Sequence, residues 1–416
     1  MKTIRVFLVL CLLVALITGS LAFASGPVTI NALFMKQAGY SEEDTKSGTA
    51  EFEKLNPKIK VQTTFVAYEE LEQKIITSAQ SGSYDVVLSD GPFTAKFAQA
   101  KILREVTLSE AEKKDIFSGA LGSCMYKGKI YGLPWLNDCR YLFYNKSMLS
   151  KAGFSAPPKT MSEMLQQAKV IKEKGIAQYP IAWTWAQAEA LMCDYVPLAT
   201  IFGGGLVAKN GKPQINSEGN KKALDFMAGS IKSGLSNPKS TEFLEDDVKG
   251  TFESGNAAFA FNWTYMYAAA QDPKESKLAP ADVGIAIIPG EGKVVSGTCN
   301  GGQPLGISAG SKHPAEALKY MKYLTSKQFQ QKYCSNALPI WISLYDDPAV
   351  VASNPAVVKV AKEQYKYFVN RPIVPYYGEL STFMQVKIQE VLLGKKTSDV
   401  ALKECQAKAE ELATKK

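Results

Sequence analysis

Three apolar segments alternate with two amphipathic ones near the start of this chain, and this order constrains the fold more than any other feature. The expected strands are 28–34, 59–66 and 84–90, and the expected helices are 43–55 and 68–81. A β-α-β-α-β order is typical of an α/β fold in which helices cover both faces of an open sheet. Ligands of such sheets bind beyond the carboxyl ends of the strands, which is where Asp90 follows Val86-Val87-Leu88.

The first 24 residues have the pattern of a secretory signal peptide. Lys2 and Arg5 precede an apolar run over residues 6–17, and the small-residue motif Ala22-Phe23-Ala24 follows it. The apolar run is too short to span a bilayer. We therefore expect cleavage after Ala24 and export of residues 25–416 to a periplasmic or extracellular location, with retention at the cell surface as a further option.

The exported part of the chain is longer than one compact core usually is, so two lobes are expected. The formal net charge is +8, but Lys and Arg are interspersed with Asp and Glu along the chain. Such mixing is typical of solvated helix faces and argues against a nucleic-acid partner. Only four residues are Arg, which makes the position of Arg140 unusual for this chain.

The segment Gly132–Lys146, GLPWLNDCRYLFYNK, places a polar cluster between two apolar runs. Trp135 stands just before Asn137-Asp138-Cys139-Arg140, and a strand is expected to resume at Arg140. A simple connection would use small turn residues, and a buried strand would not contain two charged positions, because burying a charge is costly. We interpret the segment as a crossing between two structural units whose side chains face a ligand.

At least three of the five tryptophans fall where an expected strand ends or a crossing begins. The five are Trp135, Trp183, Trp185, Trp263 and Trp341. For any single tryptophan, a buried core position is the common alternative. Several of them beside Asp, Asn and Arg favour a small-ligand site, because a sugar offers C–H groups to an aromatic ring and hydroxyls to polar side chains.

Several segments, taken in order, resemble family 1 extracellular solute-binding proteins, the maltose-binding-like components of ATP-binding-cassette sugar importers. They include GSYDVVLSDG, YKGKIYGLPW, FGGGLV, FESGNAAFAFNW and RPIVPYYGEL. The resemblance extends over nearly all of the chain after residue 24. It implies two α/β lobes that close by hinge motion on a ligand cleft, a sugar (mono- or oligosaccharide) as ligand, and membrane permease subunits as partners.

The resemblance also implies three lobe crossings, at the segment Gly132–Lys146, near Gly297–Gly302 and near Leu338–Ser343. The N-terminal lobe would then comprise residues 25–137 and 302–340, and the C-terminal lobe residues 138–301 and 341–416.

Individual positions follow from the same resemblance. Trp135 and Asp138 match the aromatic and the acid after GLP, and Asp90 matches the acid after the third strand. Trp263, Gly301-Gly302 and Arg371-Pro372 match further family positions. Arg140 stands where a neutral polar residue is more usual, which leaves room for an acidic or unusually polar ligand. The expected ligand-binding residues are Asp90, Trp135, Asn137, Asp138, Arg140, Trp183, Trp185, Trp263, Asn300, Gly301, Trp341, Tyr376 and Tyr377.

Six cysteines follow the signal peptide, namely Cys124, Cys139, Cys193, Cys299, Cys334 and Cys405. An even number in an oxidising compartment permits three disulfides, so we expect at least one. Cys124–Cys139 is favoured because both residues flank the same expected hairpin and crossing. No C-x-x-C occurs, so neither a zinc site nor a thioredoxin-type motif is indicated, and we expect no cofactor.

Two other functions stay open. Tyr376-Tyr377 resembles the paired tyrosines of ferric-ion-binding relatives, and tyrosinate is a hard oxygen ligand that suits iron. A secreted glycoside hydrolase would also use aromatic rings and carboxylates. Sugar binding without catalysis, by a monomer, is the favoured hypothesis. A bare ion needs no aromatic plates, and the G-x-S-x-G match at 306–310 has no usable base, since the single histidine is His313.

Overall fold

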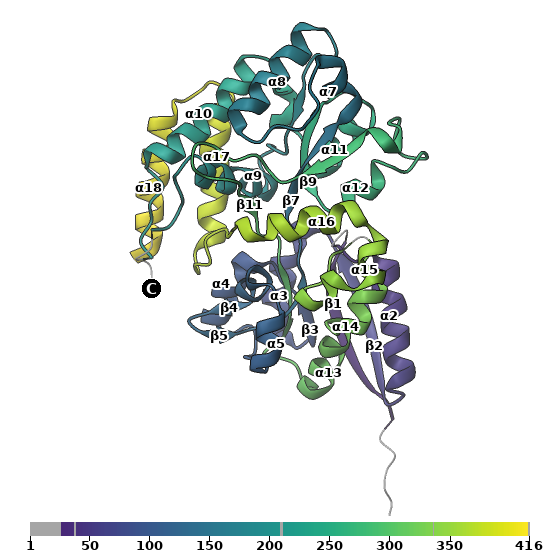
Figure 1. The fold of residues 1–416 in the computed structure, drawn as a ribbon. Helices are drawn as coiled ribbons and strands as arrows, with labels where there is room; N and C mark the ends of the chain where they lie inside the picture. Colours follow the sequence, from purple (N-terminus) through teal and green to yellow (C-terminus); the bar gives the residue numbers. More distant parts are fainter. Residues whose placement is uncertain (1–25, 37–38, 209–210, 336, 415–416) are drawn as a thin grey trace, which may run out of the picture.

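The computed structural model describes residues 26–36, 39–208, 211–335 and 337–414, which form two lobes, one above the other in Figure 1. The expected signal peptide, residues 1–24, lies outside the described residues. Among the described residues, no helix combines the length and the apolar content needed to cross a membrane.

The lower lobe is built on a mixed five-stranded sheet with the order β2-β1-β3-β12-β6. Its strands are β1 (Val28–Met35), β2 (Ile59–Val66), β3 (Val86–Leu88), β6 (Leu133–Leu136) and β12 (Gln303–Ile307). β1 pairs in parallel with β2 and β3, whereas β12 runs antiparallel to β3 and β6. The predicted β-α-β-α-β start is therefore confirmed, and one strand joins the sheet from far along the chain.

Helices cover both faces of this sheet. They are α2 (Glu42–Leu55), α3 (Tyr68–Ser81), α4 (Thr94–Gln99), α5 (Glu110–Asp115), α6 (Ser118–Ser123), α13 (Pro314–Leu324) and α14 (Lys327–Lys332), and the hairpin β4 (Met125–Tyr126) and β5 (Lys129–Ile130) lies beside them. A capping box between Ser41 and Asp44 begins α2. Successive side chains of a strand point to opposite faces of the sheet. Leu33 of β1 therefore packs in the apolar layer on one face, and Phe34 packs in the layer on the other.

The upper lobe has a four-stranded sheet with the order β10-β7-β9-β8. The strands are β7 (Arg140–Asn145), β8 (Ile181–Ala182), β9 (Phe259–Trp263) and β10 (Val283–Ala286). Its helices are α7 (Lys146–Ala152), α8 (Met161–Glu173), α9 (Glu189–Ile201), α10 (Glu218–Lys232), α11 (Glu245–Glu253), α12 (Tyr265–Ala269), α17 (Tyr377–Leu392) and α18 (Ser398–Thr414). Figure 1 shows α17 and α18 at one side of this lobe, where they pack on α10.

The two lobes meet where three chain segments come together. β11 (Thr298–Cys299) pairs with β13 (Phe368–Val369), and Gly301 N donates to the carbonyl oxygen of Asp138 at 2.9 Å. The side-chain amide of Asn137 donates to the carbonyl oxygen of Pro339 at 3.3 Å. The helix α16 (Pro355–Gln364), which follows α15 (Pro348–Ser353), lies across the boundary between the lobes in Figure 1.

The predicted Cys124–Cys139 disulfide is wrong, because both cysteines are free. The thiol of Cys124 lies in an apolar layer of the lower lobe and donates to the carbonyl oxygen of Leu121 at 3.0 Å. Cys139 lies in an apolar layer of the upper lobe. The strand β6, which stands between them in the chain, carries the backbone from one lobe to the other and separates the two thiols.

Candidate functional site

The side chains that join the two lobes centre on Arg371, which follows β13. Its two terminal nitrogens donate to the two carboxylate oxygens of Asp90, each at 2.9 Å. Asp90 follows β3, so the parallel part of the sheet places it at the carboxyl end of the strands. The hydroxyl of Tyr68, the first residue of α3, donates to the same carboxylate at 2.8 Å.

Arg371 also binds the upper lobe through Glu189, the first residue of α9. The Nη1–Oε1 distance is 2.9 Å. The hydroxyls of Tyr377 and Ser381, both on α17, donate to the same carboxylate at 2.5 Å each. One guanidinium therefore links a carboxylate of each lobe. We call Tyr68, Asp90, Glu189, Arg371 and Tyr377 the Arg371 cluster.

A second buried guanidinium, that of Arg140, lies at the start of β7. Its Nη1 donates to Asp194 at 2.7 Å and its Nη2 to Glu245 at 2.6 Å. The hydroxyl of Thr184 also accepts from Nη1. The indole of Trp263 lies over the guanidinium, 4.9 Å from its carbon to the ring centroid, and its Nε1 donates to Glu245 at 3.2 Å. We call these five residues the Arg140 cluster.

Each guanidinium in the two clusters has two carboxylate partners, so negative charge exceeds positive charge around both. Burial alone would lower the pKa of Arg140, but Asp194 and Glu245 outweigh it and hold that pKa above its ordinary value. The pKa of Arg371 is also raised against burial, chiefly by the charge of Asp90. Neither arginine is therefore left as an unpaired positive charge that would recognise an anion.

The carboxyl group of Asp138 lies beside the Arg140 cluster. It accepts hydrogen bonds from the hydroxyl of Thr264 and, at 2.8 Å, from the backbone N–H of Cys139. Burial raises the pKa of Asp138 to about 6, although these hydrogen bonds and the charge of Arg140 act to lower it. Asp138 is thus an acid at the lobe crossing that titrates close to neutral pH.

Trp263 is the most exposed of the five tryptophans, and it stands at the end of β9 as predicted. A Cβ added to Gly301 would lie 2.5 Å from Cζ3 of this indole. Glycine at that position therefore lets the indole lie directly against the lobe crossing. The expectation that Trp263 and Gly301 adjoin a ligand site remains a prediction that this contact supports.

The other four tryptophans do not offer a ring to a ligand, which corrects the sequence-based expectation. Trp135 packs between Phe34 and Tyr40 in the lower-lobe core, with ring centroids 5.4 and 5.0 Å away. Trp183 and Trp185 stack on each other in the upper-lobe core, at 0–1% exposure. The indole N–H of Trp341 donates to the carbonyl oxygen of Thr325 at 2.8 Å.

Asn137 and Asn300 are also buried, and both organise the crossing instead of facing a ligand. The Asn137 amide binds the third crossing at Pro339. The Asn300 amide donates to the carbonyl oxygen of Gly119 and to Asn370 Oδ1, each at 2.8 Å. Their predicted role as direct ligand contacts is therefore not supported by where their side chains point.

The paired tyrosines are not arranged as metal ligands. The phenol of Tyr377 is buried and donates to Glu189, and burial raises its pKa well above its ordinary value. Tyr376 is half-buried against the upper-lobe core, and burial raises its pKa as well. A tyrosinate ligand requires the deprotonated phenol, which both environments disfavour. In the part of the chain that the structure describes, no three His, Cys, Asp or Glu side chains gather as a metal site would require.

Five members of the two clusters were missed by sequence reasoning: Tyr68, Thr184, Glu189, Asp194 and Glu245. Glu189 and Glu245 each stand in the first turn of a helix, where acidic residues are common for purely electrostatic reasons. Tyr68 begins α3 directly after β2, which is a position beyond the carboxyl end of a strand. That position is the one signal in the sequence that would have identified it.

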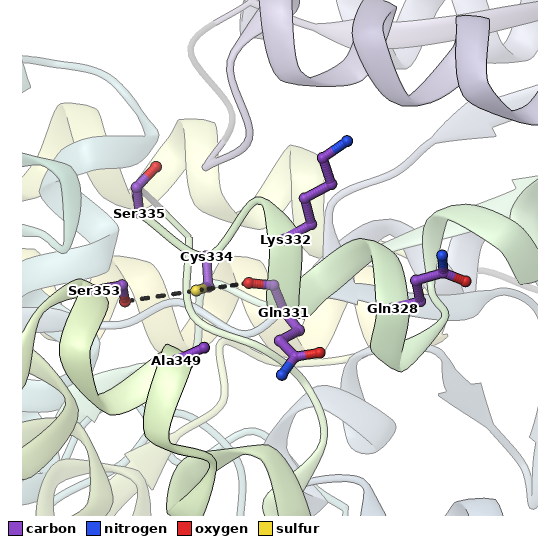
Figure 2. Close-up of a pocket in the computed structure, with 7 residues that line it drawn as sticks. All are labelled: Gln328, Gln331, Lys332, Cys334, Ser335, Ala349 and Ser353. Carbon is purple, nitrogen blue, oxygen red and sulfur yellow. Dashed lines mark hydrogen bonds between the residues drawn. The ribbon is translucent and has the colours of Figure 1, made fainter.

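A surface hollow lies apart from both clusters, between α14 and α15. Figure 2 shows that its lining comes from the ends of these two helices and the turn after α14. The thiol of Cys334 donates there to the carbonyl oxygen of Gln331 at 3.1 Å and to Ser353 Oγ at 3.5 Å, as the dashed lines in Figure 2 mark. The hollow contains neither of the two arginine clusters.

Comparison with known proteins gives consistent matches. Residues 36–331 match the family described as "Bacterial extracellular solute-binding protein". A curated "Probable ABC transporter-binding protein" of Deinococcus radiodurans is 29% identical over 340 residues, which cover 78% of this chain and 79% of that protein.

Solved structures match over nearly the whole chain. Maltose-bound MalE3 of T. maritima has a TM-score of 0.84 at 28% identity, covering 92% of this chain and 100% of that chain. An ABC transporter solute-binding protein of Thermotoga lettingae, bound with α-D-tagatose, has a TM-score of 0.81 at 25% identity, covering 92% and 99%. These proteins share the two-lobed α/β architecture described above.

Proposed function

Because this chain belongs to the family of bacterial extracellular solute-binding proteins, we propose that it binds a neutral sugar between its two lobes and delivers it to an ATP-binding-cassette importer. The Arg371 cluster is the observation that carries this proposal. In it, one guanidinium joins Asp90 of the lower lobe to Glu189 of the upper lobe. A ligand at this place contacts both lobes and is held only when they close together.

The chemistry of the two clusters suits hydroxyl groups. A sugar hydroxyl donates one hydrogen bond and accepts others, and carboxylates and guanidinium groups supply the complementary partners. The half-buried indole of Trp263 supplies a flat apolar surface for the C–H face of a sugar ring. Glu189 and Trp263, one half-buried member of each cluster, are therefore the residues we assign to ligand contact. The buried Asp90–Arg371 pair positions Glu189, and Asp138 and Gly301 support the indole side.

The ligand that this arrangement favours is uncharged. The sequence left room for an acidic ligand because of Arg140, but Asp194 and Glu245 already neutralise that guanidinium. A carboxylate on the ligand would meet the excess negative charge of both clusters without a free cation to bind it. The maltose and tagatose bound in the two similar structures are uncharged sugars, which agrees with this assignment.

The remaining parts of the proposal follow from the family and the fold. We infer that the lobes comprise residues 25–137 with 302–340 and residues 138–301 with 341–416. We further infer that the protein acts as an exported monomer, docks on membrane permease subunits and binds no nucleic acid. It has no catalytic role, so turnover of chromogenic glycosides by the purified protein would contradict the proposal.

A thermal-shift screen tests the central claim. A sugar that binds only the folded protein stabilises it by about 2.7 kcal/mol at a hundredfold excess over Kd. We expect at least one neutral mono- or oligosaccharide in a broad panel to raise the melting temperature, with calorimetry then giving its affinity. A panel without effect, together with visible absorbance on adding ferric ion, would instead favour the iron-binding alternative through Tyr376 and Tyr377.

A further inference from the structure

Glu245, the first residue of α11, is the most exposed charged member of the two clusters. Its side chain is 27% exposed, against 14% for Glu189 and at most 3% for the other charged members. Asp194, the second carboxylate on Arg140, is buried, so the two partners of that guanidinium differ in what they can reach. Glu245 is therefore the charged group that a ligand reaches most readily.

One oxygen of the Glu245 carboxylate is held from two sides. Oε1 accepts from Arg140 Nη2 at 2.6 Å and from the indole Nε1 of Trp263 at 3.2 Å. The side-chain amide of Asn262, on β9, also donates to the backbone carbonyl oxygen of Glu245 at 2.8 Å. Backbone and side chain are thus both fixed, so the carboxylate has its orientation before any ligand arrives.

The other oxygen of this carboxylate keeps its capacity to accept hydrogen bonds. In the part of the chain that the structure describes, no donor binds Glu245 Oε2, whereas both oxygens of Glu189 accept from side chains. The indole bound to Oε1 lies against Gly301 at the lobe crossing. Glu245 therefore brings a charged acceptor to the place where the indole of Trp263 adjoins the crossing.

We propose that Glu245 is a specificity residue whose Oε2 accepts a hydrogen bond from one hydroxyl of a sugar ring lying on Trp263. This inference rests on the proposed sugar binding and adds a substituent that the site selects. The indole N–H points to Glu245, so a sugar ring on the indole face has its own edge beside the carboxylate. Arg140 makes no ligand contact in this proposal and acts as a positioning residue that holds Oε1.

Calorimetry with deoxy sugars tests whether one hydroxyl is selected. The probes are the neutral sugars of the thermal-shift panel, starting with maltose and D-tagatose, and the monodeoxy analogues of each sugar that binds. We expect the loss of one particular hydroxyl to weaken binding to the wild-type protein by about tenfold or more, because a hydrogen bond to a charged acceptor is lost. An analogue series in which no single loss exceeds about threefold would overturn the proposal.

Glu245→Gln tests which side chain accepts from that hydroxyl. The amide keeps one oxygen for Arg140 and Trp263, but it places a neutral NH2 group where Oε2 stood. We expect the parent sugar to bind about tenfold more weakly to this variant, whereas the analogue without the selected hydroxyl binds both proteins within about threefold. Glu242→Gln is the matched control, since it removes the same charge from an exposed side chain three positions earlier and should leave both affinities unchanged.

The possible results separate this assignment from the proposed function. An equal loss of affinity in Glu245→Gln for the parent sugar and for every analogue would mean that Glu245 only holds the indole, which overturns the proposal and leaves sugar binding intact. Wild-type protein that binds no sugar of the panel would overturn the proposed function and this assignment together. The deoxy series on the wild-type protein does not depend on the folding of any variant.

Discussion

Arg371 binds Asp90 through two parallel hydrogen bonds of 2.9 Å, although the residues lie 281 positions apart in the chain. Both side chains are about 3% exposed, so the pair is shielded from solvent. Bidentate guanidinium–carboxylate pairs are strong and fix relative orientation. Because Asp90 follows β3 and Arg371 follows β13, this pair connects the end of the lower sheet to the β11–β13 pair where the lobes meet.

Replacing Arg371 should be severely destabilising. Arg371→Gln leaves the carboxylates of Asp90 and Glu189 buried without their cation, which costs about 3–5 kcal/mol when a buried pair loses one partner. Unfolding by denaturant measures this loss. The matched control is Lys46→Gln, which removes an exposed pair with Glu42 at 3.1 Å and should change stability by less than about 1 kcal/mol. Equal effects of both substitutions would mean that the Arg371 cluster contributes no more than a surface pair.

Substituting Trp263 should weaken ligand binding, whereas substituting Trp183 should lower folding stability. Trp263→Ala removes the half-buried ring at the lobe crossing, so we expect sugar affinity to fall by about tenfold or more, corresponding to about 1.4 kcal/mol. Trp183→Ala removes a ring stacked on Phe261 at 3.8 Å inside the core, and it should cost about 3–5 kcal/mol of folding stability instead. Calorimetry and denaturant unfolding on both variants give the two quantities. Unchanged affinity in Trp263→Ala would remove this indole from the ligand site.

The fold was largely predictable because its signals are local. The apolar segments at residues 28–34 and 59–66 became β1 and β2, and the expected helix 68–81 matches α3 residue for residue. Such patterns depend on neighbouring residues in the chain and on strand and helix periodicity. The hairpin expected after Cys124 is formed by β4 and β5, and the two residues of its turn, Lys127 and Gly128, have positive φ angles of 48° and 77°.

The site was only partly predictable because burial is not local. Trp183 and Trp185 come just after β8, and Trp263 ends β9, yet the first two lie in an apolar core that includes residues of α9 and, from far along the chain, of α17. Glu189 and Glu245 look like ordinary first-turn acids of two helices, and only the folded chain brings a guanidinium to each. Asp90, by contrast, follows β3 as expected, because the strand pattern alone fixes where a sheet ends, and its contact with a ligand stays a prediction.

The charge of the ligand should decide its affinity. We expect a sugar acid, such as a uronate, to bind at least about tenfold more weakly than its neutral parent, because both arginines are already paired with carboxylates. Competition calorimetry with matched neutral and acidic sugars measures the difference. Raising the ionic strength should change the affinity of the neutral sugar little, since no net charge is recognised. Tighter binding of the acid would mean that one guanidinium exchanges its carboxylate partner for the ligand.

Asp138 should make folding stability depend on pH near neutrality. Its pKa in the folded protein is about 6, above the ordinary value of 3.8, so the folded state holds this proton more tightly than the unfolded chain does. Stability contributed by the protonated group is therefore greatest below about pH 4 and is lost as the pH rises through about 6. Asp138→Asn keeps the shape and the oxygen that accepts from Cys139 N, but it cannot titrate.

We therefore expect wild-type protein to gain about 1 kcal/mol of stability relative to Asp138→Asn when the pH falls from about 7 to about 5. Denaturant unfolding at both pH values gives the change in unfolding free energy of each protein, and the wild-type change is compared with that of Asp138→Asn. The buried carboxyl group of Asp194, whose pKa is also raised, titrates in both proteins and cancels in the comparison. Stability curves that run parallel from pH 7 to pH 5 would show that hydrogen bonds from Thr264 and Cys139, with the charge of Arg140, outweigh burial and hold Asp138 ionised.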